Sequence, residues 1–280
     1  ISSSASNLYG FDFGILQNAI KDREVPATIE YFEPETGERA FLAGVGIRVF
    51  GTSIYSLPQR PLSVRFREKY GTDILRYPLF PDKPISRYSS FLLRNGGNDY
   101  NTAFFRDGLG VNLVKGKIDI DYQDYKPCVV FINGVYNGIY EFRERLDEQY
   151  IGNNHEINSE NLDYLEDSLQ VVTGSEHNFK DLMEFVQNNN LADAENYAYV
   201  ESQVDINEFL NYQILRSFIG YQIADLNNHY WKNRDADGNP KWRWVAADLE
   251  HGFGQLSGDP VDENTISKLA GFLGDLPEWA

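Results

Sequence analysis

The hydrophobic pattern of the chain changes from a strand-like to a helix-like period near residue 145, and this change constrains the fold more than any other feature. In the first half, segments 41–50 and 62–67 carry the β-branched and aromatic residues that are typical of strands. Within the second segment polar and apolar residues alternate, which places Arg65 and Arg67 on one face of the strand. These segments predict a β-sheet in the first half of the chain.

A hairpin is predicted at the end of this strand-rich half. The apolar residues 129–132 are followed by Asn133-Gly134, and residues 135–144 resume an alternating pattern. An Asn-Gly pair between two apolar strands is the strongest short-range signal of a β-hairpin. The two segments are therefore expected to pair in antiparallel register.

In the second half, apolar residues recur at helical spacing. Asn178 is expected to cap a helix that continues to about Val186. A longer helix is expected to begin at Asp205, where Glu208 three residues on completes a pattern like the capping box, and to end near Gln222.

Together these patterns predict an α+β protein. A chain of 280 residues is long enough to form one large domain or two lobes, and either arrangement can bury a sizeable hydrophobic core. We expect a strand-rich lobe over residues 1–145 and a helix-rich lobe over residues 146–280.

Composition excludes some classes of function. No run of roughly 18 apolar residues is present, so the sequence predicts no membrane-spanning helix. The 25 basic and 42 acidic residues give a net charge of −17, which argues against broad binding of nucleic acid. A small anionic ligand remains compatible with this charge if a basic pocket or a divalent cation screens it.

The residues after the longer helix carry the candidate chemistry. The chain reads as a polar loop with Asp225 and Asn228, a strand, a tight turn, a second strand and an acidic loop that begins at Asp248. Because hairpin strands are antiparallel, both loops open at the same end, and we expect Asp225 and Asp248 to be neighbours. Protein kinases place a catalytic Asp, a metal-binding Asn and a metal-binding Asp in this order. The alternative is that all three are ordinary loop and strand-end residues, and spacing alone leaves it open.

Five sequence blocks in series resemble the CotH kinase family, a group of atypical kinases that resemble spore coat protein H. The blocks are residues 57–71, 91–99, 105–107, 131–145 and 227–254. The resemblance implies a reduced protein-kinase-like fold, in which a small antiparallel-sheet lobe and a helical lobe bind ATP with Mg²⁺ or Mn²⁺. The family generally continues with further helices, so we expect the sequence that stops at Ala280 to be a fragment.

Carried over position by position, the resemblance implies roles in metal binding and catalysis for four residues. Asp248 resembles the metal-binding Asp, Asn228 a second metal ligand, and Asp225 the Asp that orients the acceptor hydroxyl. Glu250 stands where the family tends to show a second Asp. A Glu there is still able to bind a metal, although its side chain is one bond longer.

The resemblance also implies a cation that binds the phosphates of ATP. Arg60 stands where the family usually carries Lys, and its forked guanidinium binds phosphate with a different geometry. Arg65 and Arg67 are the substitutes in the same block. Glu141 or Glu144 is the expected partner that holds the cation in place.

Four further charged residues recur in the resemblance without a chemical role: Arg94, Asp99, Arg106 and Asp107. We expect them to form a structural network that ties the two lobes together, with substrate binding as the alternative.

The resemblance implies an ATP-dependent protein Ser/Thr kinase or autokinase that acts on coat or surface proteins. Its location is then extracellular or on the cell or spore surface, and its partner is a protein with Ser or Thr acceptors. Two alternatives stay open. Arg60 and Glu250 are compatible with a structural or surface interaction protein whose kinase-like pocket has decayed, and the same metal site would also serve an enzyme that transfers AMP.

Overall fold

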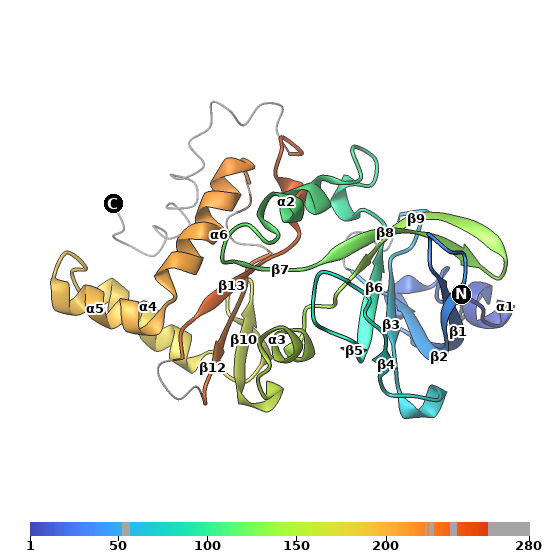
Figure 1. Cartoon of the computed structure of the whole chain (residues 1–280), viewed down its shortest axis with the longest axis horizontal. Coiled ribbons are helices and arrows are strands. Elements are labelled where there is room, and N and C mark those ends of the chain that lie inside the picture. The colour runs from blue at the N-terminus through green and yellow to red at the C-terminus, as the bar shows by residue number, and fades with distance from the viewer. Residues whose placement is uncertain (52–56, 222, 224–226, 236–239, 257–280) are drawn as a thin grey trace. The chain divides into compact units, whose positions relative to one another are not determined.

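The chain forms two compact units. Unit 1 comprises Ile1–Phe104 and Asp124–Arg145, and unit 2 comprises Phe105–Gln123 and Leu146–Ala280. The computed structural model describes residues 1–51, 57–221, 223, 227–235 and 240–256 (Figure 1). Residues 105–123, which were expected in the first lobe, belong to unit 2 because they contribute a helix and a strand to it.

Unit 1 is built on a six-stranded antiparallel sheet in the order β1-β2-β3-β6-β9-β8. The strands are β1 (Val25–Phe32), β2 (Arg39–Val49), β3 (Leu62–Arg65), β6 (Ser90–Arg94), β8 (Tyr125–Ile132) and β9 (Val135–Arg143). A short helix α1 (Ala5–Tyr9), the small pair β4 (Leu75–Arg76) and β5 (Arg87–Tyr88), and the 3-10 turns Ala19–Lys21, Glu68–Tyr70 and Gly97–Asp99 complete the unit.

The first two residues connect the edges of this sheet. Ser2 pairs with Thr28 on the edge strand β1. The amino group of Ile1 donates to the carbonyl of Phe131 at 2.9 Å, and the N–H of Asn133 donates back to Ile1 at 2.9 Å, beside the opposite edge strand β8. The sheet therefore curls upon itself.

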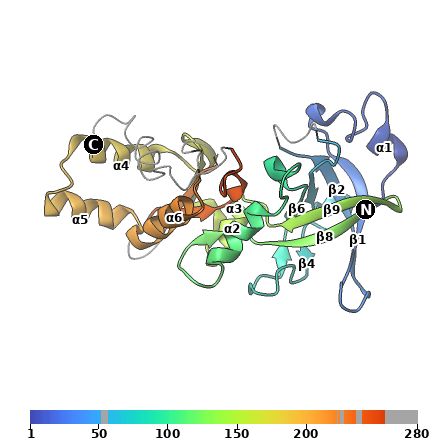
Figure 2. The same cartoon turned by 90° about the horizontal axis from the view of Figure 1, so that it is seen from above.

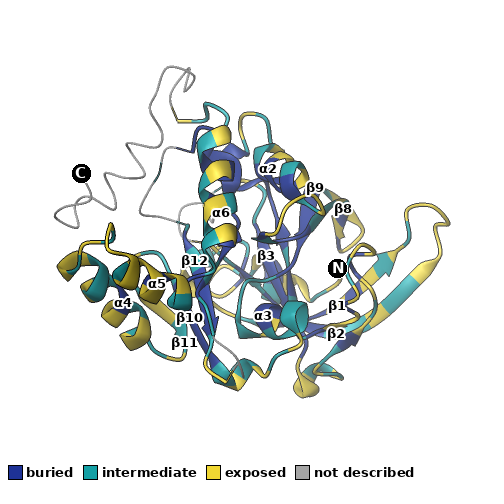
Figure 3. Ribbon diagram, turned by 60° about the vertical axis from the view of Figure 1, so that its left-hand side comes forward, coloured by how far each residue is buried: buried dark blue, intermediate teal, exposed yellow. Residues whose placement is uncertain are grey.

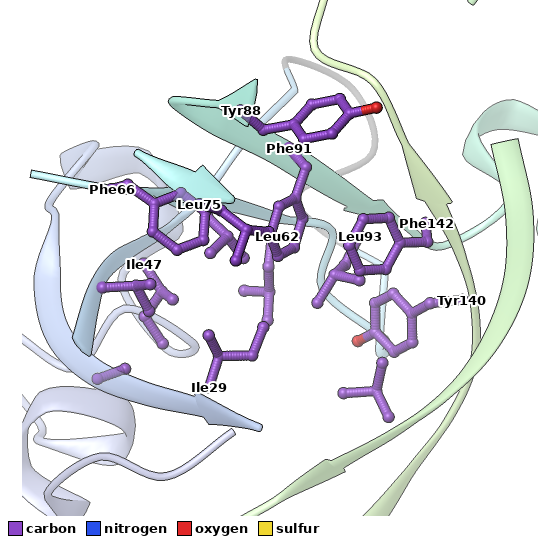
Figure 4. Close-up of a cluster of buried hydrophobic side chains, with 14 of the residues drawn as sticks. Ile29, Ile47, Leu62, Phe66, Leu75, Tyr88, Phe91, Leu93, Tyr140 and Phe142 are labelled. Carbon is purple, nitrogen blue, oxygen red and sulfur yellow. The ribbon is translucent and has the colours of Figure 1, made fainter. Parts of the chain in front are cut away.

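The hydrophobic core of unit 1 fills one face of the curled sheet (Figure 4). Leu62 and Val64 of β3 are fully buried there, and the rings of Phe91 and Phe142 stack with their centroids 4.2 Å apart. The expected strands at 41–50 and 62–67 are confirmed as β2 and β3. However, β3 ends at Arg65, so the expectation that Arg67 lies on the same strand is wrong.

The Asn-Gly hairpin is confirmed between β8 and β9. Ile132 pairs with Val135 across the turn. Asn133 and Gly134 have φ angles of 50° and 79°, the left-handed conformation that a two-residue hairpin turn demands and that Asn and Gly adopt at low cost.

Unit 2 holds a five-stranded sheet in the order β11-β10-β12-β13-β7, in which β13 and β7 are parallel and the other pairs antiparallel. Its strands are β7 (Asp121–Tyr122), β10 (Leu162–Glu166), β11 (Gln170–Thr173), β12 (His229–Asn233) and β13 (Arg243–Ala246). Its helices within the described residues are α2 (Arg106–Val114), α3 (Glu148–His155), α4 (His177–Asn188), α5 (Ala194–Gln203) and α6 (Ile206–Phe218), with 3-10 turns at Ser159–Asn161 and Leu249–His251.

The helices of unit 2 differ in how deeply they are buried. α4 and α5 lie side by side, with the ring centroids of Phe185 and Tyr199 4.1 Å apart, and most of their outer surface is exposed (Figures 2 and 3).

Among the described helices, none combines the length and the apolar character that crossing a bilayer requires.

Both expected helices of the second half are present, with two corrections. α6 begins as predicted, because the carboxylate of Asp205 accepts the N–H of Glu208 at 3.3 Å. It ends at Phe218, ahead of the predicted end. Asn178 does not cap α4: its side chain donates to Asp163 at 2.7 Å, and the hydroxyl of Ser175 accepts the N–H of His177 at the start of the helix.

Candidate active site

The hairpin of β12 and β13 brings the two candidate loops of unit 2 to one end of the sheet. His229 pairs with Val245 in antiparallel register. The loop with Asn228 therefore enters β12 at the same end at which Asp248 leaves β13, as the sequence predicted. Asp225 lies outside the described residues.

Three carboxylates converge at the acidic loop. Asp107, Asp248 and Glu250 each offer an oxygen within 4.8 Å of the others. Asp107 and Glu250 are only 3% and 1% exposed, whereas Asp248 is half-buried. Asp248 and Glu250 are predicted metal ligands, and the structure adds Asp107, for which the sequence suggested a structural network or, as the alternative, substrate binding.

The packing of α2 against the acidic loop explains the position of Asp107. The N–H of Leu249 donates to the carboxylate of Asp107 at 3.0 Å. At Gly110, one turn further along α2, an added Cβ would lie 2.6 Å from the side chain of Leu249. The absence of a side chain at Gly110 thus permits the close approach of α2 and the loop.

Hard divalent cations fit this set of donors. Mg²⁺, Mn²⁺ and Ca²⁺ prefer carboxylate oxygens, whereas three like charges at this separation repel one another in a buried setting. A bound cation would relieve this repulsion. The residues that would hold it are Asp107, Asp248 and Glu250.

Asn228 is fixed by neighbours on α6. Its amide oxygen accepts hydrogen bonds from the hydroxyl of Tyr212 at 3.1 Å and from the guanidinium of Arg216. Arg216 also donates to the carbonyl of Ile223 at 2.5 Å. The oxygen expected to bind metal is thus used in a buried hydrogen-bond network, and its role as a metal ligand stays a prediction.

Arg216 is a residue that sequence reasoning missed. Its side chain is 2% exposed, and its guanidinium lies 4.3 Å from the ring centroid of Tyr221. By donating to Ile223 and Asn228 it fixes the loop on both sides of Asp225. Its position in the amphipathic pattern of α6 gave no signal of this role.

His229, at the start of β12, lies near several carboxylates that affect its pKa. Burial lowers the pKa of His229, while the nearby carboxylates of Asp248, Glu166 and Asp167 raise it and only partly compensate. The hydroxyl of Tyr164 lies 3.1 Å from its Nδ1. The imidazole is therefore held close to its neutral form in a region of negative potential.

Unit 1 contains a buried ion pair that involves a predicted residue. The carboxylate of Glu144 binds the ammonium of Lys83 at 2.5 Å and also accepts the N–H of Asp124 at 3.0 Å. Both side chains of the pair are less than a tenth exposed. Glu144 was expected to hold the cation Arg60, and the structure places Lys83 there. Sequence gave no signal for Lys83, because a lysine in a Pro-rich loop is usually exposed.

Two of the predicted cations of unit 1 contact groups outside the predicted set. The guanidinium of Arg60 donates to the carbonyls of Leu16 at 3.2 Å and Leu57 at 2.7 Å. Arg67 pairs with Glu24 at 3.0 Å.

Glu141 and Arg65 complete the predicted set in unit 1. Glu141 pairs at 2.9 Å with the fully buried Arg143. Arg65 is half-buried, and its Nε has no hydrogen-bond partner. The structure thus pairs Glu141 with Arg143 and Glu144 with Lys83.

Comparison with known proteins identifies the family. The sequence model described as CotH kinase protein matches residues 47–272, which is most of the chain. Among curated proteins, none matches this sequence. The matched region includes the three carboxylates of the acidic cluster, the buried Lys83–Glu144 pair and the loop of Asn228. The chain belongs to the CotH kinase family.

Proposed function

We propose that the chain is a metal-dependent phosphotransferase that moves the γ-phosphoryl group of ATP to a Ser or Thr hydroxyl of a protein. The observation that carries the proposal is the convergence of Asp107, Asp248 and Glu250 in unit 2. Membership of the CotH kinase family supports phosphoryl transfer as the reaction. A protein-kinase-like fold, ATP as the donor and a coat or surface protein as the acceptor are parts of the same proposal.

The acidic cluster would supply the electrostatic part of catalysis. Phosphoryl transfer needs little covalent chemistry from a protein, because positioning and charge stabilisation lower most of the barrier. A divalent cation, when bound, neutralises charge on the transferred group. Asp107 has a second task, since its bond to the N–H of Leu249 holds the loop that carries the other two carboxylates.

Asp225 is proposed to orient the acceptor hydroxyl and accept its proton. The support comes from the resemblance and from the anchoring of its flanks: Arg216 binds Ile223 on one side and Asn228 on the other. A catalytic carboxylate needs such support, because small displacements of a reacting group lower the rate strongly.

Lys83 is proposed as the cation that contacts phosphate oxygens. The pair with Glu144 fixes the ammonium in one place, in the way that the conserved Lys–Glu pair of protein kinases does. Arg60 is a poorer candidate than the resemblance implied, because two backbone carbonyls already accept hydrogen bonds from its guanidinium.

Incubation with ATP and Mn²⁺, followed by intact-mass measurement of the chain and of an added acceptor protein, tests the proposal. We expect a phosphoryl adduct, and we expect Asp225→Asn to lower its rate of formation by about 100-fold or more, because general acid–base groups contribute on this scale. An adenylyl adduct would favour AMP transfer. A folded protein that forms neither adduct and binds no ATP under any metal condition would favour the decayed pocket.

A further inference from the structure

Arg48, Ser63 and Arg65 lie side by side on the polar face of the unit 1 sheet. Arg48 pairs with Ser63 in the register of β2 and β3, and Arg65 follows two residues along β3. Side chains alternate between the faces of a strand. Because Ile47 and Val64 belong to the hydrophobic core, the three polar side chains point to the opposite face.

All three residues have a buried polar atom whose hydrogen-bonding capacity is not used. Ser63 is 2% exposed, and its hydroxyl has no hydrogen-bond partner. The Nε atoms of Arg48 and Arg65 are buried and likewise have none. Native proteins rarely leave buried polar groups in this state. Since each group donates a hydrogen, a ligand that satisfies all three must be rich in acceptors.

The charge at this face has the sign that an acceptor-rich anion needs. Burial, and then the neighbouring Arg145, Arg48 and Arg67, lower the pKa of Arg65 to about 10, while Glu24 acts in the opposite direction. Arg65 still carries its charge at neutral pH. The guanidiniums therefore repel one another and together produce a local positive potential on a protein of negative net charge.

Two carboxylates lie at the edge of this cluster, one paired with Arg48 itself and one with neighbouring cations. Asp22 binds the Nη1 of Arg48 at 2.7 Å. Glu24 binds Arg67 at 3.0 Å and Lys69 at 3.4 Å. These pairs partly neutralise the edge of the cluster, and they leave the Nε atom of Arg48 and that of Arg65 unpartnered.

We propose that Arg48, Ser63 and Arg65 form a binding site for a phosphate group. A phosphate offers several acceptor oxygens with more than one negative charge, and its geometry suits bidentate binding by guanidinium groups. The phosphate is either free or part of a polyphosphate chain. In the second case the inference rests on the proposed function, because the chain would be that of the nucleotide.

Binding of tripolyphosphate and of inorganic phosphate to the whole chain, measured by calorimetry in EDTA at constant ionic strength, tests the site. We expect Arg65→Gln to weaken binding about 10- to 100-fold, since a hydrogen bond from a charged group contributes on that scale. Ser63→Ala is expected to weaken it less. Arg39→Gln is the matched control, because Arg39 lies on β2 in an exposed ion pair with Glu30, and it should bind as the wild type does.

The stability of Arg65→Gln in the absence of phosphate shows whether Arg65 serves ligand binding or the structure. A residue held for ligand binding is repelled by its neighbours in the free protein, so Arg65→Gln should unfold at the same or a higher urea concentration than the wild type. A structural role predicts the reverse. If Arg65→Gln does not fold, Ser63→Ala carries the affinity test.

Unchanged affinity in both variants, or binding of neither anion by the wild type, would overturn the site. Tight binding of inorganic phosphate supports a single bound phosphate, and tight binding of tripolyphosphate alone supports a nucleotide tail. Because EDTA removes divalent cations, this test is independent of the acidic cluster of unit 2. An inactive Asp248 variant that still binds phosphate would separate the two proposals.

Discussion

Glu208 is predicted to make the stability of unit 2 depend on pH. Its side chain is 0% exposed in the first turn of α6. One carboxylate oxygen accepts the N–H of Trp244 at 2.9 Å, and the other is buried without a hydrogen-bond partner. Glu208→Gln keeps the shape of the side chain and an oxygen that accepts the N–H of Trp244, but it removes the ionisable group.

Burial raises the pKa of Glu208 from 4.5 to about 8, although the bond from Trp244 and the charge of Arg243 lower it. Between these two pH values the folded protein holds a proton that the unfolded chain has lost. The stabilisation that comes from neutral Glu208 is therefore complete below pH 4.5 and is lost as the pH rises through about 8.

The size of the effect follows from the shift. Each unit of difference between the pKa of Glu208 in the folded and the unfolded protein corresponds to about 1.4 kcal/mol of stability. Most of the pH interval between these two pKa values lies between about pH 5 and pH 8. We expect the free energy of unfolding of Glu208→Gln to rise by about 2–4 kcal/mol relative to the wild type over this range.

Urea denaturation followed by tryptophan fluorescence measures this difference, because every tryptophan of the sequence belongs to unit 2. Glu195→Gln is the matched control, since Glu195 occupies the first turn of α5 and is exposed. Parallel pH profiles for the wild type and Glu208→Gln would refute the assignment of a neutral buried carboxyl.

Two further predictions concern contacts that the sequence did not reveal. Lys83→Met should lower the free energy of unfolding of unit 1 by about 3 kcal/mol, because it leaves the buried Glu144 without the ammonium. Urea denaturation followed by circular dichroism measures this loss. If Lys83→Met and Lys83→Met/Glu144→Gln were each as stable as the wild type, the buried pair would be excluded. Gly110→Ala should displace the acidic loop, because the added Cβ would lie 2.6 Å from the side chain of Leu249. The expected loss of Mn²⁺ affinity is measured by electron paramagnetic resonance. Unchanged affinity would show that this contact does not hold the loop.

Features determined by local chemistry could be predicted from the sequence. The Asn133-Gly134 turn needs positive φ angles, and the two residues that adopt them readily stand between apolar strands. The start of α6 at Asp205 likewise depends on its own side chain. The antiparallel hairpin that follows then brings the two candidate loops together.

Features that depend on packing between distant segments could not be predicted in this way. Asp107 contacts Leu249 across 142 residues of sequence, through the approach of α2 to the acidic loop. Lys83 is buried in an ion pair with Glu144, which lies 61 residues further along the chain. Asn178 has the residue type of a helix cap, but α4 already begins at His177, and the Asn178 amide donates to Asp163 on β10.

The metal dependence of phosphoryl transfer is the most direct test of the proposed role of the acidic cluster. Transfer from γ-labelled ATP would be measured with EDTA and with added Mg²⁺ or Mn²⁺ for the wild type, Asp248→Asn and Asp181→Asn, the last being an exposed aspartate of α4. We expect transfer that requires the cation, is lost in Asp248→Asn and is retained in Asp181→Asn. Transfer in EDTA, or at the wild-type rate by Asp248→Asn, would contradict this expectation.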